Sequence, residues 1–377
     1  MSASQAGICR KGWKSLKYLM MALCAFFITV CLTPLIKWLS LRANAYAKEN
    51  ERTVHHGKIS RIGGVGIYIA FCVCIGLFLD TDLALIGMFA SASIMFFTGL
   101  YDDFYEIKPK TKLFWQMAAS LLLIGSGVGV NSLHLPFGIV VNNWFVSCIF
   151  TMAWVVGIVN AINLSDGLDG LAGGMCVVIF SVITAICIVD RRTDIIPVSV
   201  ILIGALLGFL VYNAHPASIF MGDCGSLFLG TIVASISLMG FKSSTIMTLA
   251  LPILILLLPI IDTFSAILRR KLKGHSFSDA DKQHMHHQLM FRFGQQKTVI
   301  IMCAITFLFG MSAFAYIYNR MLGLTAMAVL LLAIDIFIEK TGMISPSYRP
   351  LLSIANQLIN PSARKKTAKK KAEILVS

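Results

Sequence analysis

Eleven long apolar segments constrain the fold of this chain more than any other feature of its sequence. Each has roughly 17–23 residues, the length that an α-helix needs to cross the hydrocarbon core of a bilayer. Inside a bilayer every backbone N–H and C=O must be paired within the protein, and a helix does this along one segment. The composition agrees, because 57% of the residues are hydrophobic and only 13% are charged, against about 25% charged in soluble domains. The sequence therefore predicts an all-α, polytopic integral membrane protein with about 11 transmembrane helices. The expected spans are 18–40, 63–79, 83–100, 113–130, 144–162, 171–189, 195–212, 225–241, 245–267, 298–318 and 321–338.

The distribution of Lys and Arg predicts which loops face the cytoplasm. The loops on one side carry 23 of the 32 Lys and Arg residues, and those on the other side carry 8. The positive-inside rule places the richer side, and the C-terminus with it, in the cytoplasm. Four basic residues before the first span argue for the opposite orientation, but the later loops outnumber them. The predicted cytoplasmic segments are 41–62, 101–112, 163–170, 213–224, 268–297 and 339–377.

The sequence predicts one transmembrane catalytic domain, residues 1–340, followed by a basic cytoplasmic tail, residues 341–377. The sequence RKKTAKKK at 364–371 is most simply an anchor for anionic lipid headgroups. We expect the lipid bilayer as its partner, and no nucleic acid.

All polar clusters that could carry chemistry fall on the predicted cytoplasmic side, which indicates an enzyme. The central cluster is NAINLSDGLDGLAGG at 160–174, which lies between two apolar runs and contains Asn163, Asp166 and Asp169. Charges at the mouth of a membrane helix are costly unless they serve a site, and a spacing of three residues keeps these side chains close together. Hard oxygen ligands of this kind suit Mg²⁺ bound together with a phosphate. A polar loop without chemistry is the simpler alternative.

Two further clusters combine carboxylates with groups that suit a phosphate or a planar ring. The first, TGLYDDFYEIKPKTK at 98–112, has the adjacent pair Asp102 and Asp103 directly after a span, followed by three lysines that include Lys112. Adjacent carboxylates stay ionised only beside a cation or hydrogen-bond donors. The second, YNAHPASIFMGDCGS at 212–226, places Asp223 in a Gly-flanked turn before a helix, where it could hold Mg²⁺. In the same cluster, Phe220 could stack on a planar ring.

The remaining two clusters are basic and rich in histidine. In HHGKISRIGGVG at 55–66, His56 and Arg61 precede a Gly-Gly pair at a helix start, and cations beside free backbone N–H groups favour a phosphate. A flexible, positively charged loop is an equal alternative there. The loop 268–297 carries three clustered histidines, for which an anionic-substrate clamp, a Zn²⁺ site and a solvated loop all stay open. These histidines are His284, His286 and His287.

Two other classes of protein are compatible with an apolar chain, but the placement of the polar groups argues against both. A transporter or scramblase of lipid-linked sugars needs ionisable groups along a path through the spans. Here the only carboxylates inside expected spans are Asp262 and Asp335, each close to an end. A catalytically silent scaffold would not need its carboxylates and histidines on one face.

Five motifs, in order along the chain, resemble those of the polyprenyl-phosphate N-acetylhexosamine-1-phosphate transferases of membranes. The resemblance runs from about residue 40 to 320 and is closest to the bacterial undecaprenyl-phosphate N-acetylglucosamine-1-phosphate transferases that start O-antigen, common antigen or teichoic acid chains. The branch that transfers phospho-muramoyl-pentapeptide has three consecutive histidines, whereas this chain has His-Met-His-His. Ser60 stands where the family usually has proline. The motifs are SRIGG (60–64), GLYDDFYEIKPKTK (99–112), NAINLSDGLDGLAGG (160–174), YNAHPASIFMGDCGS (212–226) and DKQHMHHQL (281–289).

The resemblance implies a reaction and a donor site. A phosphate oxygen of undecaprenyl phosphate would attack the sugar-side phosphorus of a UDP-sugar, most simply UDP-GlcNAc, and UMP would leave. Asn163 and Asp223 match positions that hold Mg²⁺, or Mn²⁺, on the donor pyrophosphate. Asp169 and Phe220 match positions that bind and stack the uracil, and Asn213 matches one near the nucleotide.

The resemblance also implies an acceptor site and a setting. Asp102 and Asp103 match a catalytic pair that handles the lipid phosphate, Lys112 matches a cation of the same site, and Asp166 lies close to the metal. The residues on the donor phosphate and sugar would be His284, His286 and His287, and His56 and Arg61 are further candidates for binding a phosphate or sugar. The setting would be the bacterial inner membrane with the active site in the cytoplasm, and a homodimer is compatible with the family.

Overall fold

The computed structural model is almost entirely helical. It describes residues 3–43, 59–80, 82–130, 133–134, 140–190, 192–240, 260–261, 263 and 285–341. The only strands in this described part are the short antiparallel pair β1 (Leu133–His134) and β2 (Val140–Val141). The helices are α1 (Ala3–Arg42), α2 (Gly64–Phe78), α3 (Leu83–Tyr105), α4 (Pro109–Gly125), α5 (Trp144–Ser165), α6 (Leu171–Val189), α7 (Ile196–Asn213), α8 (Gly222–Gly240), α11 (Met285–Phe293), α12 (Gln295–Tyr318) and α13 (Arg320–Thr341).

The predicted all-α membrane fold is confirmed. Every expected span except 245–267 overlaps one of these helices, and 245–267 falls almost wholly outside the described residues. Eight helices in the described part are long and apolar enough to cross a membrane, and α2 is a shorter apolar helix. The expected number of eleven spans is therefore not established. Residues 342–377, with the basic tail, also lie outside the described part.

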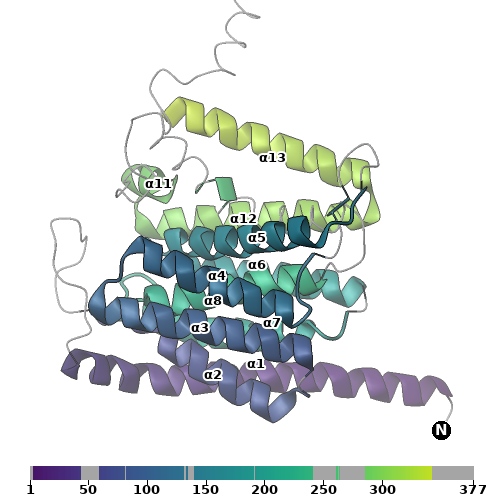
Figure 1. Ribbon diagram of the computed structural model, residues 1–377, viewed down its shortest axis with the longest axis horizontal. Helices are drawn as coiled ribbons and strands as arrows, with labels where there is room; N and C mark the ends of the chain where they lie inside the picture. The colour runs from purple at the N-terminus through teal and green to yellow at the C-terminus, as the bar shows by residue number, and fades with distance from the viewer. Residues whose placement is uncertain are drawn as a thin grey trace, which may run out of the picture.

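Helix α8 forms the centre of the bundle. It packs against α2, α3 and α5, and 89% of its apolar stretch Gly222–Met239 is buried. Its sequence, GDCGSLFLGTIVASISLMG, is rich in Gly, Ser, Thr and Ala, and small residues let membrane helices approach closely. In Figure 1 the helices lie side by side in a stack, with α1 and α2 at one edge and α13, packed on α12, at the other.

Polar loops meet at one end of this stack. The sharp connection between α3 and α4 forms because Glu106 adopts a left-handed conformation, with φ of 50°, after the end of α3, and Pro109 begins α4. These are ordinary stop and start signals for helices. Figure 1 shows α11 at the same end of the stack as this connection. The backbone of Gly63 and Gly64 donates hydrogen bonds to the carbonyls of Phe220 and Met221, which joins the start of α2 to the start of α8. The predicted clusters at 55–66 and 212–226 are therefore in contact.

Candidate active site

A lysine and two carboxylates from three helices form the centre of the polar end. The Nζ atom of Lys112, in the first turn of α4, lies 2.7 Å from Oδ2 of Asp102 and also forms an ion pair with Oδ2 of Asp223. Asp102 comes from the last turns of α3 and Asp223 from the first turn of α8. The three side chains are between 11% and 24% exposed, so water screens their charges only in part. The predicted need of the aspartate pair for a nearby cation is met by Lys112.

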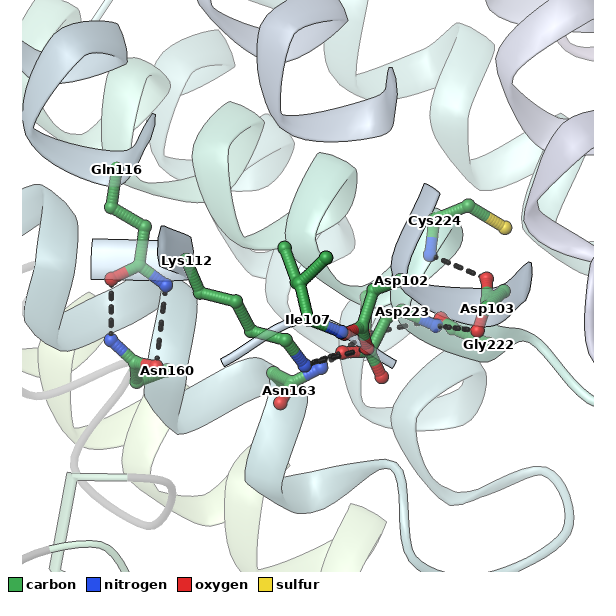
Figure 2. Close-up of polar contacts among 11 residues, drawn as sticks. Asp102, Asp103, Ile107, Lys112, Gln116, Asn160, Asn163, Gly222, Asp223 and Cys224 are labelled. Atoms are coloured by element: carbon green, nitrogen blue, oxygen red, sulfur yellow. Dashed lines mark hydrogen bonds and ion pairs between the residues drawn. The ribbon is translucent and has the colours of Figure 1, made fainter. Parts of the chain in front are cut away.

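The two adjacent aspartates face different partners. Besides the ion pair with Lys112, Asp102 accepts a hydrogen bond from the N–H of Ile107 at 2.8 Å. Asp103 accepts from the N–H groups of Asp223 and Cys224, each at 3.0 Å. Figure 2 shows Asp103 turned towards the start of α8 and away from Lys112. The structure thus separates two residues that the sequence analysis treated as one pair.

Asn163, at the end of α5, completes the cluster. Its Nδ2 atom donates to Oγ of Ser226 at 2.8 Å, and Asn163 also hydrogen-bonds the carboxylate of Asp223. The predicted partners Asn163 and Asp223 are therefore neighbours in the fold.

A pair of amides that the sequence analysis missed lies beside Lys112. The side chains of Gln116 and Asn160 exchange hydrogen bonds of 3.3 Å and 2.9 Å. Gln116 follows Lys112 by one helical turn, and Asn160 precedes Asn163 by nearly one turn. Polar side chains inside otherwise apolar helices usually face a site or another helix, so this spacing was the signal that could have found them.

Asp166 lies directly after α5, and its surroundings disfavour the charged form. Burial, followed by the negative charges of Asp223 and Asp103, raises the pKa of Asp166 to about 8, while the positive charge of Arg61 opposes the shift. Desolvation and like charges both act in this direction on a carboxylate. The effect of Arg61 on Asp166 indicates that this predicted phosphate-binding residue lies near the same cluster.

Asp169 and Asn213 tie two polar loops together. Oδ2 of Asp169 lies 2.8 Å from Nδ1 of His215 and accepts from the N–H of Ala217 at 3.2 Å. Asn213 accepts from the N–H of Gly170 at 3.0 Å and donates to a backbone carbonyl of the 213–221 loop at 2.9 Å. Both side chains are buried. Their expected contacts with uracil and nucleotide stay predictions, and His215 is a residue that the sequence analysis missed.

Phe220 is half-buried and sits in a segment held by its backbone. Its N–H donates to the carbonyl of Ser60 at 2.8 Å, and its carbonyl accepts from Gly63 at 2.9 Å. Ser60 and Ile219 form a parallel bridge. The 60–64 motif thus holds the backbone of Phe220 in place.

The predicted histidine cluster is described only in part. His56 and His284 lie outside the described residues, as does the side chain of His286. His287 is half-buried in the first turn of α11. Met285 and Leu289 of this helix share a hydrophobic cluster with Leu168 and Leu171, which places α11 against the 160–174 motif.

The oxygen ligands at the centre fit a cation that is shared with a substrate. In the described part of the chain, no three His, Cys, Asp or Glu side chains are arranged as a metal site. Mg²⁺, however, commonly takes only one or two carboxylates and completes its shell with water and substrate phosphates. Asp223, Asn163 and Asp102 supply hard oxygens, and Lys112 shows that a positive charge is stable between the two carboxylates.

Comparison with known proteins identifies the family. The family model described as glycosyl transferase family 4 matches residues 85–241, which include Asp102, Lys112, Asn163 and Asp223. A probable undecaprenyl-phosphate N-acetylglucosaminyl 1-phosphate transferase of Bacillus subtilis (strain 168) is 34% identical over 338 residues, covering 87% of this chain and 93% of the relative. A decaprenyl-phosphate N-acetylglucosaminephosphotransferase of Mycolicibacterium smegmatis is 33% identical over 308 residues, covering 72% and 75%.

A phospho-N-acetylmuramoyl-pentapeptide-transferase of Latilactobacillus sakei is 36% identical over 184 residues, but the match covers only 45% of this chain and 55% of the relative. The similarity to the N-acetylglucosamine-1-phosphate transferases thus extends along more of both chains. The chain belongs to glycosyl transferase family 4, the membrane family of polyprenyl-phosphate N-acetylhexosamine-1-phosphate transferases.

Proposed function

We propose that this protein transfers GlcNAc-1-phosphate from UDP-GlcNAc to undecaprenyl phosphate on the cytoplasmic face of a bacterial inner membrane and releases UMP. The observation that carries the proposal is the group of Asp102, Lys112, Asn163 and Asp223 at one end of the helix bundle. This group lies within the region matched by the family model. The product would start a cell-surface polysaccharide such as O-antigen, common antigen or teichoic acid.

The reaction needs the protein mainly to bring two anions together. A phosphate monoester has its second pKa near roughly 6, so the acceptor is mostly dianionic at neutral pH and does not need a strong base. Catalysis of phosphoryl transfer then depends on positioning and on electrostatic stabilisation. Lys112, at the start of α4 and 24% exposed, would pair with the acceptor phosphate.

Asp102 fits a role in orienting Lys112 better than a role as a base. One of its oxygens accepts from the N–H of Ile107 and the other is paired with Lys112. Both oxygens of Asp102 are thus engaged in contacts that hold it against Lys112 and the start of α4. The acceptor would therefore be positioned by Lys112, with Asp102 holding the ammonium group in place.

Asp223 and the side-chain oxygen of Asn163 are the residues that would hold Mg²⁺ or Mn²⁺ with the donor pyrophosphate. The bound cation would neutralise charge that develops on the phosphates. The uridine would lie towards Asp169, Asn213 and Phe220. The histidines of the 281–289 motif, with Arg61, would contact the phosphates and the sugar.

A panel of radiolabelled UDP-sugars, given to the purified protein with undecaprenyl phosphate and Mg²⁺, tests the proposal. UDP-GlcNAc should give a radiolabelled lipid and UMP, and Asp223→Ala should abolish both products. Transfer from a different UDP-N-acetylated sugar, such as a fucosamine or quinovosamine derivative, would replace the donor and keep the reaction. Absence of lipid product with every donor would contradict the proposed reaction and favour a transporter of lipid-linked sugars.

A further inference from the structure

We infer that Asp103 is a positioning residue that acts through Asp223 and does not handle the acceptor phosphate. The inference rests on the proposed function, because it assigns a role in that same site. It separates Asp103 from its neighbour Asp102, although the two residues are chemically identical and adjacent in the sequence.

Both oxygens of Asp103 are used by the backbone of α8. Oδ1 accepts from the N–H of Asp223 and Oδ2 accepts from the N–H of Cys224, each at 3.0 Å. Asp103 is only 8% exposed. Figure 2 shows it on the far side of Asp223 from Lys112. A carboxylate with both oxygens engaged and little exposure has no free side for a substrate phosphate, which would also repel it.

The contact caps a helix from outside that helix. The first N–H groups of an α-helix have no partner within it, and the N-terminus carries a partial positive charge that attracts anions. A carboxylate at an N-cap normally belongs to the residue that precedes the helix. Here it comes from α3 and fixes the first turn of α8, the turn that contains Asp223.

Two glycines make this arrangement possible. Gly99 lies one turn before Asp103 on α3, and a Cβ atom there would overlap the carbonyl group of Asp223. Gly222 has φ of 75°, and a Cβ atom there would overlap the carbonyl oxygen of Arg61 and crowd the carboxylate of Asp103. The close approach of α3 to the start of α8 is therefore built into the packing and does not depend on a substrate.

Fixing this turn also fixes the direction of the Asp223 side chain. With its own N–H held by Asp103, Asp223 reaches Lys112 and Asn163 on the other side. Loss of the cap would leave the N–H groups of Asp223 and Cys224 without this acceptor and would loosen the residue that is proposed to bind the cation. The structure thus assigns Asp103 to the cation-binding half of the site and Asp102 to the acceptor half.

The test measures Mn²⁺ binding to the purified full chain by electron paramagnetic resonance, without substrate. Asp103→Asn keeps one acceptor oxygen at nearly the same volume and should weaken Mn²⁺ binding about tenfold or more, since a charge-assisted hydrogen bond is lost. Asp82→Asn is the matched control, because Asp82 caps α3 locally through the N–H of Leu85 at 2.7 Å and should leave Mn²⁺ binding unchanged. If Asp103→Asn does not purify as a folded protein, Asp103→Ser, whose hydroxyl can accept one N–H, takes its place.

A double-mutant cycle separates action through Asp223 from general destabilisation. In an Asp223→Ala background, Asp103→Asn should weaken Mn²⁺ binding no further, because residues that act as a unit are not additive. In steady-state assays, Asp103→Asn should raise the Mg²⁺ concentration needed for half-maximal activity and leave the KM for undecaprenyl phosphate within about twofold, whereas Asp102→Asn should raise that KM.

Three results would overturn the inference. They are wild-type Mn²⁺ affinity in Asp103→Asn, an additional loss of affinity in the Asp223→Ala background, and no Mn²⁺ binding by the wild-type protein. If the protein bound Mn²⁺ as expected but transferred nothing from UDP-GlcNAc, the proposed donor would fail and the role of Asp103 would stand.

Discussion

Lys112 and Asp223 form an ion pair although 111 residues separate them in the sequence. The same ammonium group lies 2.7 Å from Asp102, so one cation is shared by two carboxylates. All three side chains are mostly shielded from water, at 24%, 19% and 11% exposed. A pair of carboxylates in such a setting is stable only while a cation is present, and this dependence leads to the first prediction.

Lys112→Ala should destabilise the protein in metal-free buffer and be rescued by Mg²⁺. Removing the ammonium leaves two partly buried carboxylates facing each other, at a cost on the order of 2 kcal/mol. The thermal unfolding temperature in EDTA should fall, and Mg²⁺ should raise it more in the variant than in the wild type. Lys110→Ala, at an exposed position of the same helix, is the control and should change neither temperature. Equal Mg²⁺ shifts in wild type and Lys112→Ala would contradict the prediction.

Phe220→Ala should impair binding of the donor and leave binding of the acceptor unchanged. Loss of one stacking contact with a planar base costs on the order of 1 kcal/mol, so the KM for the UDP-sugar should rise several-fold. Lys112→Ala should show the opposite selectivity and raise the KM for polyprenyl phosphate. Phe307→Ala, on an exposed face of α12, controls for general effects of losing a ring. Equal effects of both substitutions on both substrates, in kinetics with each substrate varied in turn, would refute this division of labour.

The sequence predicted the helices and the meeting of the motifs because both follow from simple rules. Apolar segments of membrane length must be helical, and every second loop of such a bundle returns to the same side. The motifs around Asp102, Asn163 and Asp223 lie on such alternate loops, and the structure brings them together.

The different orientations of Asp102 and Asp103 could not be predicted from the sequence. Neighbours on an α-helix point in directions about 100° apart, so only one of the two can face Lys112, and packing decides which. That packing depends on Gly99 and Gly222, whose contacts join segments more than a hundred residues apart. The partners of Asp169 and Asn213 could not be predicted either, because their contacts also join segments that are far apart in the sequence. The pairing of Gln116 with Asn160, in contrast, was signalled by polar residues at helical spacing.

Asn213→Ala should destabilise the protein without selectivity between substrates. The amide of Asn213 is 3% exposed and joins the N–H of Gly170 to the carbonyl of Ile219. Truncation leaves both backbone groups buried and unpaired at this contact, at a cost of about 1–3 kcal/mol. The thermal unfolding temperature should fall in Asn213→Ala. The unfolding temperature of Asn213→Asp, which keeps an acceptor oxygen, should lie between those of the wild type and Asn213→Ala. A stable Asn213→Ala protein with a raised KM only for the UDP-sugar would instead indicate direct contact with the nucleotide.

The metal-free protein should become less stable as the pH rises towards 8. The pKa of Asp166 is about 8 in the folded protein and about 3.9 in an unfolded chain. Between these values the folded protein holds a proton that the unfolded chain has released, so stability from this group falls as the pH rises and is lowest above about 8. Unfolding temperatures in EDTA from about pH 5 to 9 should fall more steeply for the wild type than for Asp166→Asn, which cannot ionise. Parallel curves would contradict the raised pKa.

The polar end of the bundle should face the cytoplasm. Of the 32 Lys and Arg residues, 23 lie in the loops assigned to this side and 8 in the opposite loops, and such an imbalance sets the orientation of membrane proteins. Two exposed positions in the described part report the two sides: Lys110 at the start of α4, next to the proposed site, and Thr193 between α6 and α7.

Single cysteines at these two positions, treated in intact cells with a membrane-impermeant maleimide, decide the orientation. Thr193→Cys should be labelled from outside, whereas Lys110→Cys should be labelled only after the membrane is permeabilised. The unmodified protein, with its own ten cysteines, gives the background. Labelling of Lys110→Cys in intact cells would invert the topology and place the polar cluster of Asp102, Lys112 and Asp223 outside. A nucleotide sugar made in the cytoplasm could not reach it there.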